Sequence, residues 1–426
     1  MNKRTKTTLR RWCLYGWTFA KWTMAASAIG VVCGLIGTMF HFGVHEVTAF
    51  RGTHPWVLYL LPLAGFVIVS FYKLTETDGL GTDDIIDAVH EGKRLPILLL
   101  PAIFFGTVLT HLCGGSAGRE GAALQMGGTI GQCMGRTFRL DDRDLRVATL
   151  AGMAAFFSAL FGTPLAATVF AIMVISIGVL YHVALYPSLL AALVAYGVSV
   201  RLGVEPTRFT VAVPDQSVGM FVRVAALGVL CALVSILFCK LMHGAGHLMK
   251  RIKNPWLRVI CGGFAVIALT WVFGTDYNGA GMDIVARAIA QETVAVPWAF
   301  LLKLVFTAVT LAAGFKGGEV VPSFFVGATF GCAVSPLLGL PVGFGAAVGL
   351  AAVFCGVTNC PVASTLLAVE LFGAEGMLYF ALACCLSYML SGYQGLYSSQ
   401  TILYSKLKAQ FINVHTNAYH AGEKTE

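Results

Sequence analysis

Long apolar segments follow one another along the chain, and several of them are interrupted. Glycine and proline break these segments at Gly162-Thr163-Pro164 and at Cys360-Pro361, and other segments fall short of a full span. A simple membrane-spanning helix needs about twenty apolar residues. Irregular backbone at membrane depth is tolerated only where protein or water surrounds it. The pattern predicts an all-α integral membrane protein with broken helices, of the kind found in transporters and channels.

The composition agrees with a membrane protein. Of the 426 residues, 57% are hydrophobic and 12% are charged, and the mean hydropathy is +0.77; soluble domains carry about 25% charged residues. Basic residues precede the first apolar segment and aromatic residues such as Trp12 and Trp17 follow them, which favours a cytoplasmic N-terminus. The net charge of +8 is concentrated near the N-terminus and around 136–146 and 250–258. These basic stretches suit the anionic face of a lipid bilayer rather than nucleic acid.

No metal or cofactor site is indicated by the cysteines and histidines. The 12 cysteines include no Cys-x-x-Cys pair, so neither a zinc site nor a disulfide framework is expected. His41 and His45 are four residues apart, as are His243 and His247, but no third ligand accompanies either pair.

An internal repeat divides the chain. Residues 152–168 resemble residues 349–365, and matching glycine patterns precede both, at Gly127-x-Thr129-x-Gly131 and Gly327-x-Thr329-x-Gly331. Two homologous halves with interrupted helices predict a binding site where the halves meet. We expect a basic cytoplasmic segment (1–23), a first membrane repeat (24–202), a linker (203–218), a second membrane repeat (219–404) and a short C-terminal tail (405–426).

The glycine-rich stretch from Gly114 to Gly128 places Arg119 and Glu120 next to each other in apolar surroundings. Its second half can begin a helix, whose N-terminus presents free N–H groups and a partial positive charge that suit an anion. Ionisable residues within a membrane usually face a cavity or a pathway. The alternative is a polar surface loop in which Arg119 pairs with Glu120.

Four stretches, in order along nearly the whole chain, resemble motifs of the CLC family of anion channels and transporters. They are Gly79-Leu80-Gly81, Gly118-Arg119-Glu120-Gly121, Gly317-Gly318-Glu319-Val320-Val321-Pro322, and Gly392 to Gln400 with Tyr397. The resemblance implies the CLC fold: a homodimer with one anion pathway per subunit, built from two inverted repeats, in the inner membrane of a bacterium.

The resemblance also implies roles for individual residues. Glu120 would be the gating glutamate that competes with the anion and carries a proton, and the Tyr397 hydroxyl would donate to the anion. The anion-binding positions would be Gly79, Leu80, Gly81, Gly118, Arg119, Gly121, Val320, Val321 and Tyr397.

Departures from the family pattern separate its branches. Leu80 replaces the pore serine of typical chloride members, and Met173 or Val174 replaces the second acid of chloride/proton exchangers. Glu319 and the segment around Tyr397 resemble the fluoride/proton antiporter branch, which, however, usually has methionine at the position of Leu80 and threonine at that of Val321. Glu319 is a candidate second proton carrier; the alternative is an acid that caps a helix start.

We therefore expect a transporter of chloride or other halides that exchanges them for protons through Glu120. Fluoride/proton antiport and a passive anion channel are the alternatives. An enzyme is not expected, because no nucleophile or metal set accompanies the Arg-Glu pair. The expected partners are chloride or fluoride ions, protons, the lipid bilayer and a second copy of the chain, without nucleic acid.

Overall fold

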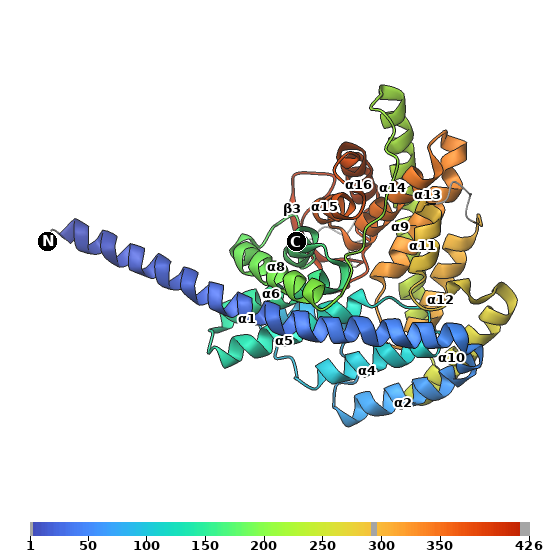
Figure 1. Cartoon of the computed structure of the whole chain (residues 1–426), viewed down its shortest axis with the longest axis horizontal. Coiled ribbons are helices and arrows are strands. Elements are labelled where there is room, and N and C mark those ends of the chain that lie inside the picture. Colours follow the sequence, from blue (N-terminus) through green and yellow to red (C-terminus); the bar gives the residue numbers. More distant parts are fainter. Residues whose placement is uncertain (1–2, 291–295, 418–426) are drawn as a thin grey trace.

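The computed structural model describes residues 3–290 and 296–417 and consists mainly of helices (Figure 1). The first half contains α1 (Lys3–Thr53), η1 (Pro55–Leu60), α2 (Leu61–Leu74), α3 (Thr82–Glu91), α4 (Leu99–Leu112), α5 (Glu120–Thr137), α6 (Asp142–Phe161), α7 (Pro164–Met173), β1 (Ser176–Ile177), η2 (His182–Ala184) and α8 (Leu185–Arg201). The second half contains α9 (Val218–Met249), α10 (Pro255–Phe273), η3 (Thr275–Tyr277), α11 (Met282–Ala290), α12 (Ala299–Ala313), α13 (Val320–Leu338), α14 (Val342–Thr358), α15 (Pro361–Phe372), α16 (Met377–Leu390), β2 (Thr401–Tyr404) and β3 (Phe411–His415).

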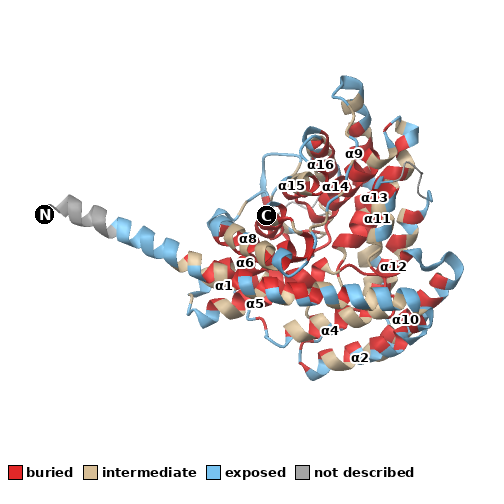
Figure 2. Cartoon of the chain, viewed as in Figure 1, coloured by how far each residue is buried: buried red, intermediate tan, exposed pale blue. Residues whose placement is uncertain are grey.

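Seven helices within the described ranges are long and apolar enough to cross a bilayer, and others, such as α4, α7, α12 and α15, are apolar but shorter. This mixture confirms the broken-helix membrane fold expected from the sequence. Helix α1 continues without interruption through the expected boundary at 23 and 24. Its N-terminal part projects beyond the body of the protein, and residues 11–20 are exposed (Figures 1 and 2).

The second half repeats the first, element by element, about 200 residues later. Helices α4, α5, α6 and α7 correspond to α12, α13, α14 and α15. Even the breaks match: α7 and α15 both begin at a proline, after Thr163 (φ −122°, ψ 71°) and Cys360 (φ −119°, ψ 70°) respectively. Proline is favoured at this first helical position because its missing N–H would be unpaired there in any case.

The two halves meet through a short antiparallel bridge between the loops that precede α5 and α13. The Gly118 amide donates to the Gly318 carbonyl at 2.7 Å, and the Gly318 amide donates to the Gly118 carbonyl at 2.8 Å. The two segments therefore run in opposite directions where they meet, as inverted repeats require.

A second reciprocal pair of hydrogen bonds joins the repeats two residues before the bridge. The Ser116 amide donates to Thr310 Oγ1 at 3.1 Å, and the Lys316 amide donates to Thr110 Oγ1 at 3.2 Å. Because each repeat caps the other's loop, neither loop would have its backbone groups satisfied without the other repeat.

Glycines allow the paired helices of each repeat to approach closely. A methyl group on Gly131 of α5 would lie 2.1 Å from the Ala148 carbonyl oxygen of α6, and one on Gly331 of α13 would lie 2.1 Å from the Gly345 carbonyl oxygen of α14. Small residues at helix interfaces are a major source of packing in membranes, where lipid supplies no hydrophobic drive for association.

A small sheet, which the sequence analysis did not predict, ties the C-terminal segment to both repeats. Strand β1 pairs in parallel with β2, and β2 pairs antiparallel with β3. Next to β2, Gln400 Nε2 donates to the carbonyls of Val174 and Thr358, at 2.9 Å each, at the ends of α7 and α14. The segment that carries Tyr397 is thereby fixed.

Charged side chains gather where α5 ends and α6 begins, with four arginines and three aspartates between residues 136 and 146. Lys21 of α1 pairs with Asp144 at the start of α6, beside the arginine-rich stretch 136–146. Helix α1 runs from this region along the body of the protein and ends at Thr53 (Figure 1).

Substitution at Gly131 tests the close helix approach. We expect Gly131→Ala to destabilise the protein by about 1–3 kcal/mol, as overpacked cores do, and to lower the thermal unfolding midpoint in detergent. Gly197→Ala is the matched control, because a methyl group on Gly197 in α8 would meet nothing within 4 Å. Equal midpoints for the two variants would contradict this interpretation.

Candidate functional site

Glu120 lies buried at the point where the two repeats meet. It is the first residue of α5, follows the N-cap Arg119, and is 1% exposed. Its Oε2 accepts from the Arg119 amide at 2.9 Å, and its Oε1 lies 3.5 Å from Arg119 Nε. The carboxyl also lies near the backbone amide of Val321 in the other repeat. Within the described residues Oε1 has no hydrogen-bond partner, so this oxygen can still accept one.

Arg119 is half-buried and held from two sides. Besides its contact with Glu120, its NH1 lies 3.0 Å from Nδ1 of His41 on α1. A guanidinium can only donate, so His41 Nδ1 accepts this hydrogen bond and a neutral His41 carries its proton on Nε2. The surface-loop alternative for this stretch is therefore wrong, because Arg119 and Glu120 sit inside the protein.

Glu319 is the N-cap of α13, at the position that corresponds to Arg119 in the first repeat, but its side chain makes no capping hydrogen bond. It is half-buried. A methyl group on Gly121 would lie 3.6 Å from Glu319 Oε2, and one on Gly118 would lie 2.6 Å from Glu120 Oε2. Glycine at these two positions therefore leaves room for two carboxyl groups between the repeats.

Tyr397 carries a free hydroxyl. The residue is 3% exposed, and its hydroxyl is buried without a hydrogen-bond partner in the described parts of the chain. Glu120 and Glu319 both lie close enough to act on this hydroxyl electrostatically. Thr416 Oγ1 donates to the Tyr397 carbonyl at 2.5 Å and holds the loop in place.

The stretch Gly79-Leu80-Gly81 is tied to the Tyr397 loop through Asp83, whose Oδ1 accepts from the Ser399 amide at 3.0 Å. Gly79 has a φ of +82°, which suits glycine, and Gly81 is the N-cap of α3. Leu80 is partly buried and packs against the apolar core. The stretch is also tied to α5, since the neighbouring Thr82 accepts from Gln125, five residues beyond Glu120.

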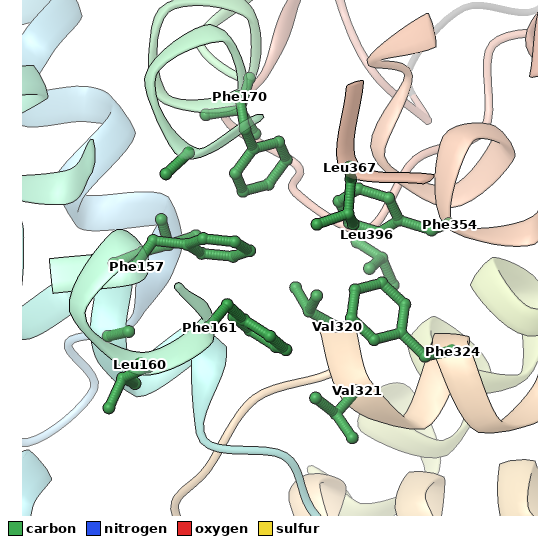
Figure 3. Packing of buried hydrophobic residues seen from close by; sticks show 14 of the residues in the cluster. Phe157, Leu160, Phe161, Phe170, Val320, Val321, Phe324, Phe354, Leu367 and Leu396 are labelled. Carbon is green, nitrogen blue, oxygen red and sulfur yellow. The ribbon is translucent and has the colours of Figure 1, made fainter. Parts of the chain in front are cut away.

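Val320 and Val321 contribute an apolar wall. Both side chains are buried in a cluster with Phe324 and Phe161 (Figure 3), so only their backbone N–H groups could face an anion. Five phenylalanines of this cluster form a closed ring with centroid separations of 4.9–5.9 Å, namely Phe157, Phe161, Phe324, Phe354 and Phe170. The ring draws on both repeats and keeps water from the centre of the contact.

A cavity of about 330 Å³ opens above Glu120. We call it the vestibule; Glu120 and Phe161 lie at its base, and Arg51 and His111 are among its lining residues. Neither Arg51 nor His111 belongs to a recognised motif, and sequence reasoning missed both. Their roles depend on α1 and α4 being brought beside α5, which no local pattern reveals.

The arrangement is suited to binding a small anion. The N-termini of α5 and α13 converge on one buried spot, and each presents unpaired N–H groups and the positive end of its dipole. Two carboxyl groups and a free hydroxyl stand beside them. A carboxylate and an anion would compete for the same donors, and a carboxyl group can also carry a proton.

Comparisons with known proteins identify the family to which the chain is similar. The family described as voltage gated chloride channel matches residues 63–392. A "Chloride/fluoride channel protein" of Pseudomonas syringae pv. tomato is 39% identical over 91% of this chain and 88% of its own length. The "H(+)/Cl(-) exchange transporter ClcA" of Cronobacter sakazakii is 26% identical over 82% of this chain and 81% of its own.

Among solved structures, a CLC-type fluoride/proton antiporter matches with a TM-score of 0.88 and 32% identity, over 91% of this chain and 99% of its own. A slow cyanobacterial Cl⁻/H⁺ antiporter matches with a TM-score of 0.75 at 20% identity, over 87% of this chain and 94% of its own, which supports the fold alone.

The two interpretations of Glu319 differ in their effect on stability. Glu370 of α15 does cap a helix: it accepts from the amides of Leu165 and Ala166 of α7, at 3.1 and 2.8 Å. We expect Glu370→Ala to cost about 1 kcal/mol, as lost caps do, and Glu319→Gln to leave the thermal midpoint unchanged. A fall in the midpoint for Glu319→Gln as large as that for Glu370→Ala would favour a structural role for Glu319.

Proposed function

The chain belongs to the voltage-gated chloride channel family, and on this basis we propose that it exchanges halide ions for protons across the membrane, with fluoride as the preferred anion. The observation that carries the proposal is the convergence of Glu120, Glu319 and the free Tyr397 hydroxyl at the contact between the repeats. Two acids supply proton sites, and the helix N-termini supply the anion site.

The proposed exchange uses Glu120 as the shared element. When ionised, its carboxylate occupies the donors at the start of α5 and excludes the anion. When it takes up a proton, it releases those donors and the anion binds in its place. Glu319 receives or supplies protons on the side of the site that faces Tyr397, so that anion and proton cross in opposite directions.

Fluoride is favoured by two considerations. The relative at 39% identity is named a chloride/fluoride channel protein and the one at 32% a fluoride/proton antiporter, whereas the ClcA relative, named an H⁺/Cl⁻ exchange transporter, is at 26%. Fluoride is also the smallest halide and the strongest hydrogen-bond acceptor among them, which suits a site built from N–H and O–H donors. Chloride/proton exchange is the second candidate, supported by the ClcA relative, and a passive channel is the third.

We propose further that the chain acts as a homodimer in the bacterial inner membrane, with the arginine-containing segment 136–146 toward the cytoplasm. The family resemblance supports the dimer, and the basic residues around 136–146 support the orientation.

Transport in proteoliposomes tests the anion and the coupling. Vesicles loaded with fluoride or chloride are diluted into anion-poor buffer, and anion efflux and proton movement are recorded together. We expect fluoride to leave faster than chloride and protons to move in the opposite direction against an imposed pH gradient. Faster chloride efflux with opposed protons would favour the second candidate, and anion efflux without protons the channel.

Glu120→Gln tests the coupling residue. An amide carries no proton, so we expect proton movement to fall at least tenfold relative to the unaltered chain in the same vesicle assay. Glu46→Gln, which changes an exposed acid on α1, is the control and should leave proton movement as it is. Unaltered proton movement in Glu120→Gln would remove Glu120 from the coupling.

Tyr397→Phe tests the hydroxyl donor. The loss of one hydrogen bond, worth about 0.5–1.5 kcal/mol, should lower the ratio of fluoride to chloride efflux by roughly two- to tenfold. Tyr404→Phe, at a position that is 47% exposed, is the control. An unchanged ratio in Tyr397→Phe would show that the hydroxyl does not contact the anion.

A further inference from the structure

The vestibule above Glu120 contains a buried nitrogen without a partner. His111 of α4 is 1% exposed, and its Nδ1 lies 2.9 Å from the Thr107 carbonyl oxygen. A carbonyl can only accept, so Nδ1 carries the proton in this hydrogen bond. The other ring nitrogen, Nε2, is buried with no hydrogen-bond partner in the described ranges, and His111 lines the vestibule. A buried polar atom left unpaired in a polar cavity indicates a ligand or water there.

Beside His111 lies Arg51, a cation on which the exposed Asp283 acts electrostatically without forming an ion pair. Arg51, near the end of α1, is half-buried and donates from NH1 to the His111 carbonyl at 2.6 Å. Of the ion pairs formed by the described residues, none includes Arg51. A half-buried guanidinium that is hydrogen-bonded to a neutral carbonyl, and attracted only by an exposed and water-screened acid, has its charge incompletely compensated, so an anion beside it would be stabilising.

We propose that the vestibule holds a small inorganic anion of its own, bound between Arg51 and the protonated Nε2 of His111. The site lies outside the position of the Glu120 carboxylate and would take the anion before Glu120 yields its place. Neutral His111 offers Nε2 only as an acceptor, which repels an anion. With a proton it offers an N–H donor, so anion binding in this site favours the uptake of a proton.

The surrounding charges explain why the proton and the anion bind together. The cations that act on His111 are Arg51 of α1, Arg119 of α5 and Lys303 of α12. Lys303 is fully buried and donates to the carbonyls of Tyr277 and Gly279 at 3.1 and 2.6 Å. Burial is the main effect that opposes a positive charge on His111, like charges add to it, and a bound anion offsets part of this opposition. Coupling of this kind is reciprocal: the proton favours the anion as much as the anion favours the proton.

The remaining charged and titratable groups of the vestibule are Glu120 at its base and, elsewhere along its lining, His41, His45, Asp276, Asp283 and Arg287. His41 already accepts from Arg119, so its Nδ1 is occupied. Asp276, Asp283 and Arg287 are exposed, and water screens their effect on the buried nitrogen.

The inference rests on the proposed function in taking the anion to be a halide, and its test uses binding rather than transport. Isothermal titration calorimetry measures fluoride binding to the full-length protein in lipid nanodiscs, in two buffers of different ionisation enthalpy. The difference between the buffers gives the number of protons taken up. In the double variant Glu120→Gln/Glu319→Gln, where neither pore acid titrates, we expect fluoride binding still to take up part of a proton.

Addition of His111→Gln to that background should abolish the proton uptake and weaken fluoride binding about tenfold. Persistent uptake without His111, or no uptake in the double variant, would overturn the proposal. Either result is distinct from a failure of the proposed function, because the unaltered chain is assayed separately for exchange in vesicles.

Arg51 and Arg287 form a matched pair for the second part of the test, since both are arginines that line the vestibule. We expect Arg51→Gln to weaken fluoride binding about tenfold and Arg287→Gln to weaken it less than twofold. Equal losses of fluoride affinity in the two variants would indicate that the arginines act only through the overall electrostatic potential of the vestibule. That result would overturn the proposal of a specific site. If Arg51→Gln does not fold, Arg51→Lys replaces it in the test, because lysine keeps the positive charge. A loss of fluoride affinity clearly smaller than tenfold in Arg51→Lys would support the site. A complete absence of proton uptake on fluoride binding to Arg51→Lys would contradict it.

Discussion

The reciprocal backbone pairing of Gly118 and Gly318 is the contact on which the rest of the structure depends. It fixes the two loops at the distance of a β-bridge, and α5 and α13 begin immediately after them. Their free N–H groups must therefore converge on one spot. The bridge also brings the acids close, because Glu319 directly follows Gly318 and Glu120 comes two residues after Gly118. The site is thus a property of the interface between the halves rather than of either half.

The interface between the repeats has an apolar side, from which water is excluded, and a side that contains charged side chains. A ring of phenylalanines from both repeats packs against Val320 and Val321 and excludes water on one side (Figure 3). On the other side the vestibule contains arginine and histidine side chains. In such surroundings a carboxylate gains more from fixed N–H donors than it would in water, but it also competes directly with any anion that arrives. A carboxyl group such as that of Glu120 can act both as a gate and as a proton carrier only where it is stabilised by these donors and also competes with the anion for them.

Local sequence patterns predicted the part of the site that lies close together along the chain. Arg119, Glu120 and Glu319 were identified because the glycines around them predict tight backbone geometry. The internal repeat indicated that the stretch around Glu120 corresponds to the stretch around Glu319. Arg51 and His111 were missed because each sits in an ordinary helical stretch, and only the packing of α1 and α4 against α5 gives them a role. The small sheet was missed for a similar reason: β1 has two residues and pairs with a strand more than 200 residues away.

The pairing of the two loops has a consequence for the order in which the protein is made. The amides of Ser116 and Gly118 find their partners at Thr310 and Gly318, about 200 residues later in the chain. At a synthesis rate of about 5–20 residues per second, that interval is roughly 10–40 seconds. During this time the first repeat stands in the membrane with its central loop unsatisfied. The first half is therefore incomplete after its insertion, and its central loop gains its hydrogen-bond partners only when the second half has been synthesised.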